Sequence, residues 1–346
     1  MTKETKIKKI YLTVDTECHN ISNINKTIYG KTKSGESFGI EKILQLGKEL
    51  DVPVNVFLDI PECHRYGDEH IQAIINLVNK YEQPIFLHVH PDYIGDKNKK
   101  HLWEYTEDEQ RNILRIALDD YYRFCGPHEK IVFRAGAWGV NDTTYKVLRE
   151  QLPESQYEII DLSYVYKSNW RCRLSYDEYG AANAARKYRG INILPNTTYI
   201  GFDYFGKTQT TSFSVPNPNF SVFKRIIDNN TLHDITFTMH SWDFIKRWFF
   251  LPKHIAGDKY LIWKFKKCVK YARQHGYKFE NLNNYTVNED TDQCQNLCKS
   301  IGGKLRCLWY NFFSFALIGR SYRKYALLYF SPVIILLTIM LFLLIN

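Results

Sequence analysis

The stretch Lys8–Asn20, KKIYLTVDTECHN, decides the fold because a strand pattern runs directly into an acidic ending. Its first part, KKIYLTV, is rich in alternating apolar and β-branched residues, which predicts a buried strand. That strand ends in two acids, Asp15 and Glu17. Residues two apart on an extended chain point to the same side, so both carboxylates are expected on one face. A core strand that finishes in paired acids indicates chemistry at this end of the sheet.

The alternation of strand and helix patterns continues along the chain. The helical spacing in GIEKILQLGKEL is followed by the apolar run VPVNVFLDI, and the same order recurs up to YEIID. One of the later helices opens with Thr106 and Glu109 in capping-box register. The region from about 162 to 230 has no clear pattern, and order returns with the strand DITFTMH. Repeated strand–helix units predict an α/β fold whose parallel sheet is open or closed into a barrel.

Size and charge narrow the classes of function. The chain has 346 residues, is 45% hydrophobic and carries a net charge of +9, which excludes wholesale disorder and predicts a sizeable core. The positive charge fits nucleic acid, an anionic membrane or an acidic substrate. No nucleic-acid-binding motif accompanies it, so no nucleic-acid partner is expected. The eight cysteines have no framework spacing, which indicates a reducing compartment.

The C-terminal part is apolar. Residues 325–345 carry no charge over about the ~20 residues that a membrane-spanning helix needs, which predicts a transmembrane helix rather than a buried core helix. Arg320, Arg323 and Lys324 precede this segment and only Asn346 follows it, so the positive-inside rule predicts a cytoplasmic N-terminal domain. The start of the chain lacks a secretory signal pattern. We therefore expect a single-pass membrane protein with a C-terminal anchor, and a lipid membrane as a partner.

Two further segments have a possible relation to the membrane. Residues 283–324 are expected to form a linker and a membrane-proximal segment, in which the apolar run 308–319 is too short to span. That run either lies in the membrane interface or packs on the domain. The basic helix expected over Lys259–Arg273 is either an ordinary solvated face or rests on anionic headgroups.

Polar residues gather at the expected carboxyl ends of the strands, where parallel α/β proteins place their functional groups. They are Asp15, Glu17, His88, His90, Asp92, Arg134, Asp161 and His240. Alternation along an extended chain lets His88, His90 and Asp92 face one point. Two imidazoles and one carboxylate leave positions open for water, which is typical of a catalytic metal site. A His-x-His pair alone is weak evidence, but together with the acids of the first strand it favours a metal site.

The chain resembles the polysaccharide deacetylases with a NodB homology domain, carbohydrate esterase family four. The resemblance covers roughly Ile7–Leu282 and rests on five motifs in order: TVDTE, LHVHP, FRAGAWG, IIDLS and TMHSWD. FRAGAWG and HSWD look most like bacterial enzymes encoded with surface-polysaccharide assembly genes. The resemblance implies that residues 1–282 form a distorted (β/α) barrel. It also implies a metal-dependent hydrolase that removes an acetyl group from an N-acetylated sugar, and with the predicted anchor this suggests a lipid-linked or surface-polysaccharide precursor.

The first two motifs imply the metal ligands. By resemblance, Asp15 is the general base and Glu17 holds the metal, but the family's usual pair of adjacent aspartates is here separated by Thr16. Whether Asp15 or Glu17 binds the metal therefore stays open at this point. His88 is the first imidazole ligand, while the position of the usual second histidine holds an aspartate. The second ligand is therefore either His90 or Asp92. The expected cofactor is a divalent ion, with zinc first and cobalt, nickel or manganese as alternatives.

The later motifs imply the remaining roles. Arg134 corresponds to the arginine that orients the base, and Trp138 to an aromatic wall of the substrate groove. Asp161 matches the acid that pairs with the catalytic histidine, and His240 matches that histidine, which protonates the leaving amine. Trp242 is a second candidate for the sugar groove. Structural pairing explains the arginine equally simply, and core packing explains the tryptophans.

Three other functions stay open from the sequence. The first is a hydrolase that cuts another non-peptide carbon–nitrogen bond on the same fold. The second is a non-catalytic protein that binds glycans, which the departures at Thr16 and Asp92 allow. The third is a scaffold in which the acids and histidines are structural.

Overall fold

The computed structural model describes most of the N-terminal 287 residues. The described ranges are 7–166, 171–175, 183–204, 207–247, 255–287 and 295–297. The predicted membrane span 325–345 and the apolar run 308–319 lie outside them, as does most of the predicted linker. Within the described ranges, no helix is both long and apolar enough to cross a bilayer.

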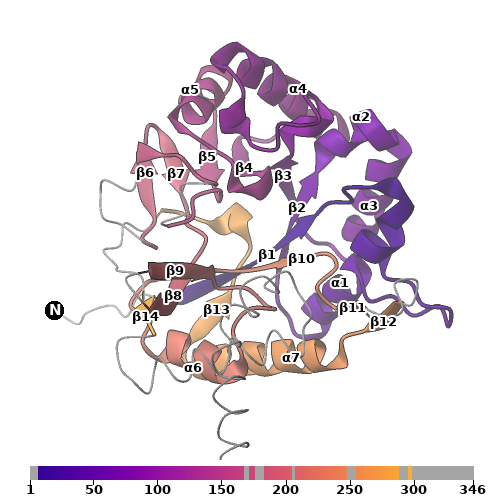
Figure 1. Cartoon of the computed structure of the whole chain (residues 1–346), viewed down its shortest axis with the longest axis vertical. Coiled ribbons are helices and arrows are strands. Elements are labelled where there is room, and N and C mark those ends of the chain that lie inside the picture. Colours follow the sequence, from indigo (N-terminus) through magenta and orange to yellow (C-terminus); the bar gives the residue numbers. More distant parts are fainter. Residues whose placement is uncertain are drawn as a thin grey trace, which may run out of the picture.

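A curled sheet forms the centre of the molecule, and helices lie around its outside (Figure 1). Eight of its strands follow the order β10-β1-β2-β3-β4-β5-β7-β6, and β13 pairs with the start of β1. The strands are β1 (Lys8–Thr16), β2 (Val54–Asp59), β3 (Ile85–Val89), β4 (Lys130–Ala135), β5 (Glu158–Asp161), β6 (Arg186–Tyr188), β7 (Ile191–Ile193), β10 (Asp234–His240) and β13 (Tyr277–Phe279). Neighbouring strands are parallel except β6 and β7. The α/β class with a mainly parallel sheet is thus as predicted, and the sheet curls into a half-barrel instead of a complete barrel.

The helices of the described residues are α1 (Ile40–Glu49), α2 (Cys63–Tyr66), α3 (Asp68–Lys80), α4 (Glu107–Cys125), α5 (Asp142–Gln151), α6 (Phe220–Asp228) and α7 (Lys259–Gln274). Five of the helices, α1, α3, α4, α5 and α7, are as the sequence pattern predicts, whereas α2 and α6 were not predicted. Thr106 caps α4 through the expected capping box with Glu109, and Asn141 caps α5. Two small sheets lie beside the main one. They contain β8 (Thr198–Tyr204), β9 (Lys207–Ser212) and β14 (Gln295–Asn296), and β11 (Ile245–Arg247) with β12 (Ile255–Gly257).

Two apolar cores lie on opposite faces of the main sheet. The larger core fills the space between the sheet and the helices. The smaller core lies inside the curl, where Tyr11, Phe57 and Phe86 pack together with Leu282 and Tyr285. Every second side chain of each parallel strand lies on the inner face of the curl. The inner-face side chains at the carboxyl ends of β1 to β4 and of β10 are polar. The fold therefore brings the polar strand ends to one edge of the curled sheet.

Candidate metal centre and active site

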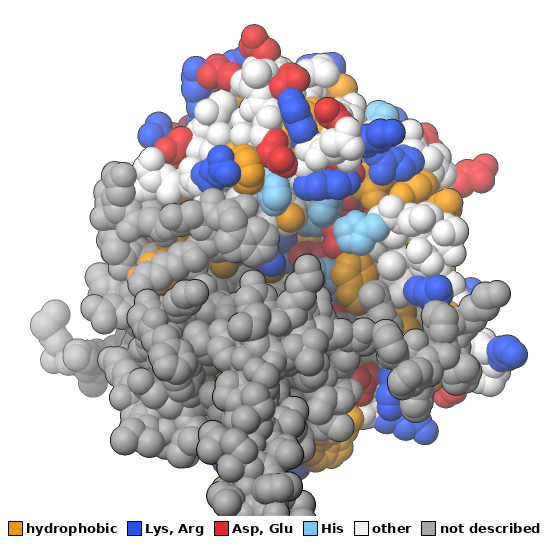
Figure 2. Space-filling view, in the orientation of Figure 1, with side chains coloured by type: hydrophobic (Ala, Val, Ile, Leu, Met, Phe, Trp, Pro, Cys, Tyr) orange, Lys and Arg blue, Asp and Glu red, His pale blue; other side chains and the backbone are white. Residues whose placement is uncertain are grey.

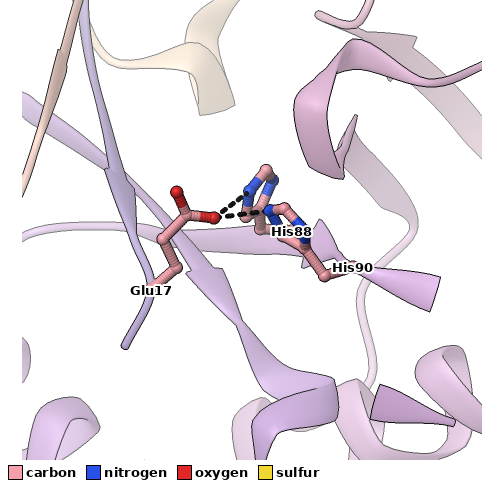
Figure 3. Close-up of side chains that lie close together, drawn as sticks. All are labelled: Glu17, His88 and His90. Carbon is pink, nitrogen blue, oxygen red and sulfur yellow. Dashed lines mark hydrogen bonds and ion pairs between the residues drawn. The ribbon is translucent and has the colours of Figure 1, made fainter. Parts of the chain in front are cut away.

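Glu17, His88 and His90 converge at the carboxyl edge of the sheet (Figure 3). Glu17 follows the last residue of β1, His88 lies in β3, and His90 comes directly after β3. Oε2 of Glu17 lies 2.5 Å from Nε2 of His90 and 3.4 Å from Nε2 of His88. One ligand atom from each of the three residues lies within 4.8 Å of the others, and all three side chains are buried. Segments about 70 residues apart in the chain thus present one oxygen and two nitrogens to a common point.

The orientation of the imidazoles of His88 and His90 is fixed by contacts with main-chain atoms and neighbouring residues. Nδ1 of His88 lies 3.0 Å from the main-chain carbonyl oxygen of Arg134, to which it donates a proton in the matching tautomer. That bond leaves the lone pair of Nε2 directed at Glu17, as metal-binding histidines require. His90 packs against Gly136, where an added Cβ would lie only 2.5 Å from the ring. The first glycine of FRAGAWG, Gly136, is therefore required for the position of His90.

Asp92 stands apart from the three-residue group. Its Oδ2 atom accepts a 2.6 Å bond from Nζ of Lys100 and lies 3.8 Å from Nη1 of Arg65. Its Oδ1 atom lies 3.9 Å from Nδ1 of His90, on the side of the ring away from Glu17. Of the two ligands left open by the sequence, the geometry therefore brings His90 to the common point and places Asp92 behind it.

Asp15 is bound by a buried arginine. Oδ1 of Asp15 accepts a very short bond from Nη1 of Arg134, and Nη2 of Arg134 donates to Thr13 at 3.0 Å. The guanidinium of Arg134 also lies 4.2 Å from the ring centroid of Phe57. Arg134 is fully buried, so this charge-assisted hydrogen bond fixes the position of the Asp15 carboxyl group. The expected pairing between the base and Arg134 is present.

Electrostatics around Glu17 favour its charged form. Burial alone would raise the pKa of Glu17, but the imidazole of His90, with hydrogen bonds from His19 and His88, holds that pKa well below its ordinary value. His19 was missed in the sequence. Its Nε2 atom lies 3.2 Å from the other oxygen of Glu17, and its ring contacts those of His90 and Trp242. A left-handed backbone at His19, with φ of 52°, turns the ring back toward Glu17.

Asp59 is a second residue that the motifs missed. It ends β2, is fully buried, and accepts the main-chain N–H of His90 through Oδ1 at 3.1 Å. Its Oδ2 atom is buried and has no hydrogen-bond partner within the described residues. Burial, followed by repulsion from Glu62 and Glu17, raises the pKa of Asp59 well above its ordinary value. The polar end of the strand VNVFLD was the only sequence signal for it.

These observations fit a divalent cation. The donor set of one carboxylate and two imidazoles matches a catalytic site for zinc or a similar ion, with positions left for water and substrate. The buried acids Glu17 and Asp59 repel each other, and a cation beside Glu17 would relieve that repulsion. Figure 2 shows histidine side chains (pale blue) gathered in a recess near the middle of the face of the molecule that it displays.

The β5 and β10 ends are arranged differently from the prediction. Asp161 is fully buried and accepts bonds from the hydroxyl groups of Tyr145 at 2.5 Å and Ser163 at 2.6 Å. No hydrogen bond joins it to His240 in the described part of the chain. Burial raises the pKa of Asp161 to about 6. His240 is half-buried, and its main-chain N–H donates to Asp243 at 2.9 Å. The expected acid–histidine pair is therefore not formed.

The two predicted aromatic residues differ in setting. Trp242 stacks on His240, with ring centroids 4.5 Å apart, so it lies beside the metal centre. Trp138 lies two residues after Gly136, and both Ala137 and Trp138 have positive φ, a strained backbone for residues other than glycine. One face of the Trp138 ring is covered by the guanidinium of Arg171 at 4.4 Å.

A second group of possible ligands lies at α2 and α4. Cys63, His64 and Asp120 are close enough to share an ion. However, a guanidinium nitrogen of Arg123 lies 2.9 Å from Asp120 and 3.8 Å from the sulfur of Cys63. Burial also raises the pKa of Cys63 to about 12, which keeps the thiol protonated. We assign this group to ion pairing with Arg123.

Comparison with known proteins gives similar folds at low sequence identity. No family model and no curated protein matches the sequence. A structure described as a polysaccharide deacetylase from Mycobacterium smegmatis is 14% identical, with a TM-score of 0.48 over 84% of this chain and 96% of its own. The family 4 carbohydrate esterase from Streptomyces lividans is 9% identical, with a TM-score of 0.42 over 83% of this chain and 98% of its own.

A structure of another kind is also similar. A maltose-forming amylase from Pyrococcus sp. is 10% identical, with a TM-score of 0.45 over 86% of this chain and 55% of its own. Polysaccharide deacetylases of carbohydrate esterase family four nevertheless recur among the similar structures, and this is the family that the five sequence motifs resemble. Since all these TM-scores are below 0.5, the function proposed below depends on the side chains of the site.

Proposed function

We propose that this protein is a metal-dependent hydrolase that removes an acetyl group from an N-acetylated sugar. One observation carries the proposal: Glu17 meets the Nε2 atoms of His88 and His90 at 3.4 and 2.5 Å, next to an Asp15 carboxylate held by Arg134. Glu17, His88 and His90 would hold the ion. When bound, a divalent cation lowers the pKa of a water molecule from about 15.7 toward ~7 and polarises an acetyl carbonyl.

Asp15 would act as the general base. Its carboxylate is oriented by an ion pair with the buried guanidinium of Arg134, next to the place where the attacking water would lie, and would accept the proton of that water. Arg134 therefore acts as a positioning residue for Asp15. The same arginine supplies the carbonyl that orients His88, so one side chain and its backbone couple the base to the metal centre.

His240 would protonate the leaving nitrogen. It is the register partner of Asp15 on the neighbouring strand, which places it beside the base and on the same face of the sheet. Its ring stacks on Trp242, and this contact fixes its orientation. An acid next to a base at one metal centre is the arrangement that amide hydrolysis needs.

The substrate class we propose is a lipid-linked or surface-polysaccharide precursor. Trp242, which stacks on His240, offers an aromatic ring for a sugar, and Trp138, two residues after the glycine that contacts His90, is a second candidate. The apolar segment 325–345 supports a membrane anchor, with the domain on the cytoplasmic side because Arg320, Arg323 and Lys324 precede it. Metal identity within the series zinc, cobalt, nickel and manganese is part of the same proposal.

The test is acetate release by the full chain from an N-acetylglucosamine oligomer, a lipid-linked N-acetylated sugar and a soluble nucleotide sugar. We expect release that stops with a chelator and returns with a divalent ion, and that is fastest on the lipid-linked substrate. Release from the nucleotide sugar alone would contradict the substrate class. Cleavage of other amides but of no acetylated sugar would point to a different carbon–nitrogen hydrolase.

A further inference from the structure

The outer face of α7 exposes aromatic side chains together with lysines. Tyr260 and Trp263 are 53% and 47% exposed, and they are two of only four large hydrophobic residues exposed to this extent in the described part of the chain. Their rings contact each other at a centroid distance of 5.7 Å. Lys267 and Lys270 continue the exposed stripe along the helix. We call these four residues the α7 face.

Packing makes the α7 face a fixed surface. Nζ of Lys267 lies 4.3 Å from the ring centroid of Trp263 and 5.6 Å from that of Phe220 in α6. Cation–π contacts of this kind hold the lysine and the ring in one arrangement. On the buried side, Lys264 donates to the carbonyl oxygens of Pro216 and Pro218, which fixes the rotation of the helix. The exposed aromatic rings are thus held outward.

All charged side chains of α7 are basic. α7 contains six basic residues and no acidic residue in KYLIWKFKKCVKYARQ. Lys259 stands in its first turn, where the helix dipole disfavours a positive charge. Within the described residues, neither Lys267 nor Lys270 forms an ion pair with a carboxylate. The lysines of the α7 face are therefore not accounted for by ion pairs with carboxylates of the described residues.

The aromatic end of the α7 face lies toward the edge of the sheet that carries the candidate active site. α7 leads into β13, which is parallel to β1, so the first turn of α7 lies on the side of the strands' carboxyl ends. Two contacts fix that end of the helix. The main-chain N–H of Asp258 donates to the carbonyl oxygen of Phe244 at 2.7 Å, and the ring of Phe265 contacts the ring of Phe244. Phe244 is only four residues after His240.

We propose that the α7 face docks on an anionic lipid surface and so presents the active-site edge to the membrane. Tyrosine and tryptophan favour the membrane interface, where a ring is buried and its polar group stays wet. Lysines close to an anionic leaflet each strengthen binding about fivefold. The chain beyond the described residues also ends in the charge-free segment 325–345, which would keep this face near a bilayer. Docking does not depend on the proposed deacetylation.

The test uses the full chain mixed with vesicles that contain brominated phosphatidylcholine, with or without 30% phosphatidylserine. Bromine quenches only tryptophans that reach the acyl region, so the comparison of wild type with Trp263→Phe isolates one ring. We expect quenching that depends on phosphatidylserine and falls by more than half in Trp263→Phe. Lys267→Glu with Lys270→Glu should abolish the phosphatidylserine dependence, while Trp103→Phe, which removes a tryptophan outside the face, should leave the quenching unchanged.

Several outcomes would overturn docking. Equal quenching in wild type and Trp263→Phe, or equal quenching with and without phosphatidylserine, would show that the face does not meet anionic lipid. A Trp263 emission shift on adding a single-stranded oligonucleotide, without lipid quenching, would identify nucleic acid instead. Concentration-dependent protection of Trp263 without lipid would identify a second copy of the chain. Because acetate release from a soluble sugar oligomer is measured separately, failure of docking and failure of the proposed hydrolase are distinguishable.

Discussion

The two sides of the active-site edge differ in how their acids are partnered. At the β1 end, Asp15 is bound to Arg134, and Glu17 meets two imidazoles. At the β5 end, Asp161 is equally buried but is bound only by hydroxyl and main-chain groups. Asp15 thus has a cationic partner beside the candidate metal ligands, whereas burial raises the pKa of Asp161, which has no such hydrogen-bonded partner, to about 6. The two acids are distinguished by their partners, an arginine for one and hydroxyl and main-chain groups for the other.

The largest effect is expected on the charged side. Asp15→Asn should lower kcat by about 10²–10⁴-fold, because the amide cannot accept a proton although it still accepts a bond from Arg134. Metal content should stay unchanged, since Glu17 and the two histidines remain. The comparison variant is Asp161→Asn, for which we expect less than a tenfold change in kcat. Equal losses in both variants would mean that Asp161 also serves the reaction.

A somewhat smaller effect is expected for His240. His240→Gln should lower kcat on an N-acetylated sugar by about 10²-fold, because the leaving nitrogen then lacks its proton donor. An acetyl ester with an acidic leaving group needs no such proton, so its hydrolysis should change little. Similar losses on amide and ester would instead indicate that His240 contributes through structure.

An effect on metal binding alone is expected for Asp59. Asp59→Asn should weaken divalent-ion binding by about 10–100-fold, because a carboxyl group whose pKa is raised in the metal-free site can ionise beside a bound cation, whereas an amide cannot. The amide oxygen still offers an acceptor for the main-chain N–H of His90. Titration calorimetry with zinc or cobalt measures this. Glu62→Gln is the matched control, since Glu62 is equally buried but already bonded to Cys18, His70 and Tyr93. If both variants bind metal like wild type, Asp59 has no role in the centre.

The smallest effect is one of stability and pH. Because burial raises the pKa of Asp161 from 3.8 to about 6, the folded protein binds this proton more tightly than the unfolded chain. The resulting stability is present below pH 3.8 and is lost as the pH rises to about 6. The loss amounts to about 3 kcal/mol. Denaturant unfolding at pH 4 and pH 7 gives the pH dependence of stability, and the loss between these pH values should be smaller in Asp161→Asn than in wild type by this amount.

Much of the arrangement around Glu17 and His88 could be predicted from the local sequence pattern. Parallel strands deliver their carboxyl ends to one edge, so polar endings such as those of Glu17 and His88 predict a meeting point even though they are 71 residues apart. The choice between His90 and Asp92 was not predictable, because it depends on Lys100 and Arg65 drawing the carboxylate away. Such ion pairs join segments whose approach is known only in three dimensions.

The ends of β5 and β10 show where prediction from the sequence motifs failed. Asp161 alternates with Ile160, so it faces α5 and the hydroxyl group of Tyr145 instead of the inside of the curl. His240 alternates with Met239 and lies on the inner face, so the contact implied by the motifs does not form. His19 was missed for another reason, since its left-handed backbone breaks the alternation that relates Asp15 to Glu17. The predicted span 325–345 remains a prediction of the sequence.

The most direct test of the account is the metal content of the purified full chain. Wild type should bind one divalent ion per chain, which a chelator removes. Glu17→Gln and His88→Ala should bind none at the same ion concentration while retaining a cooperative unfolding transition. Wild-type protein that binds no divalent ion, or variants that keep a full equivalent, would contradict the proposal that Glu17, His88 and His90 form a metal centre.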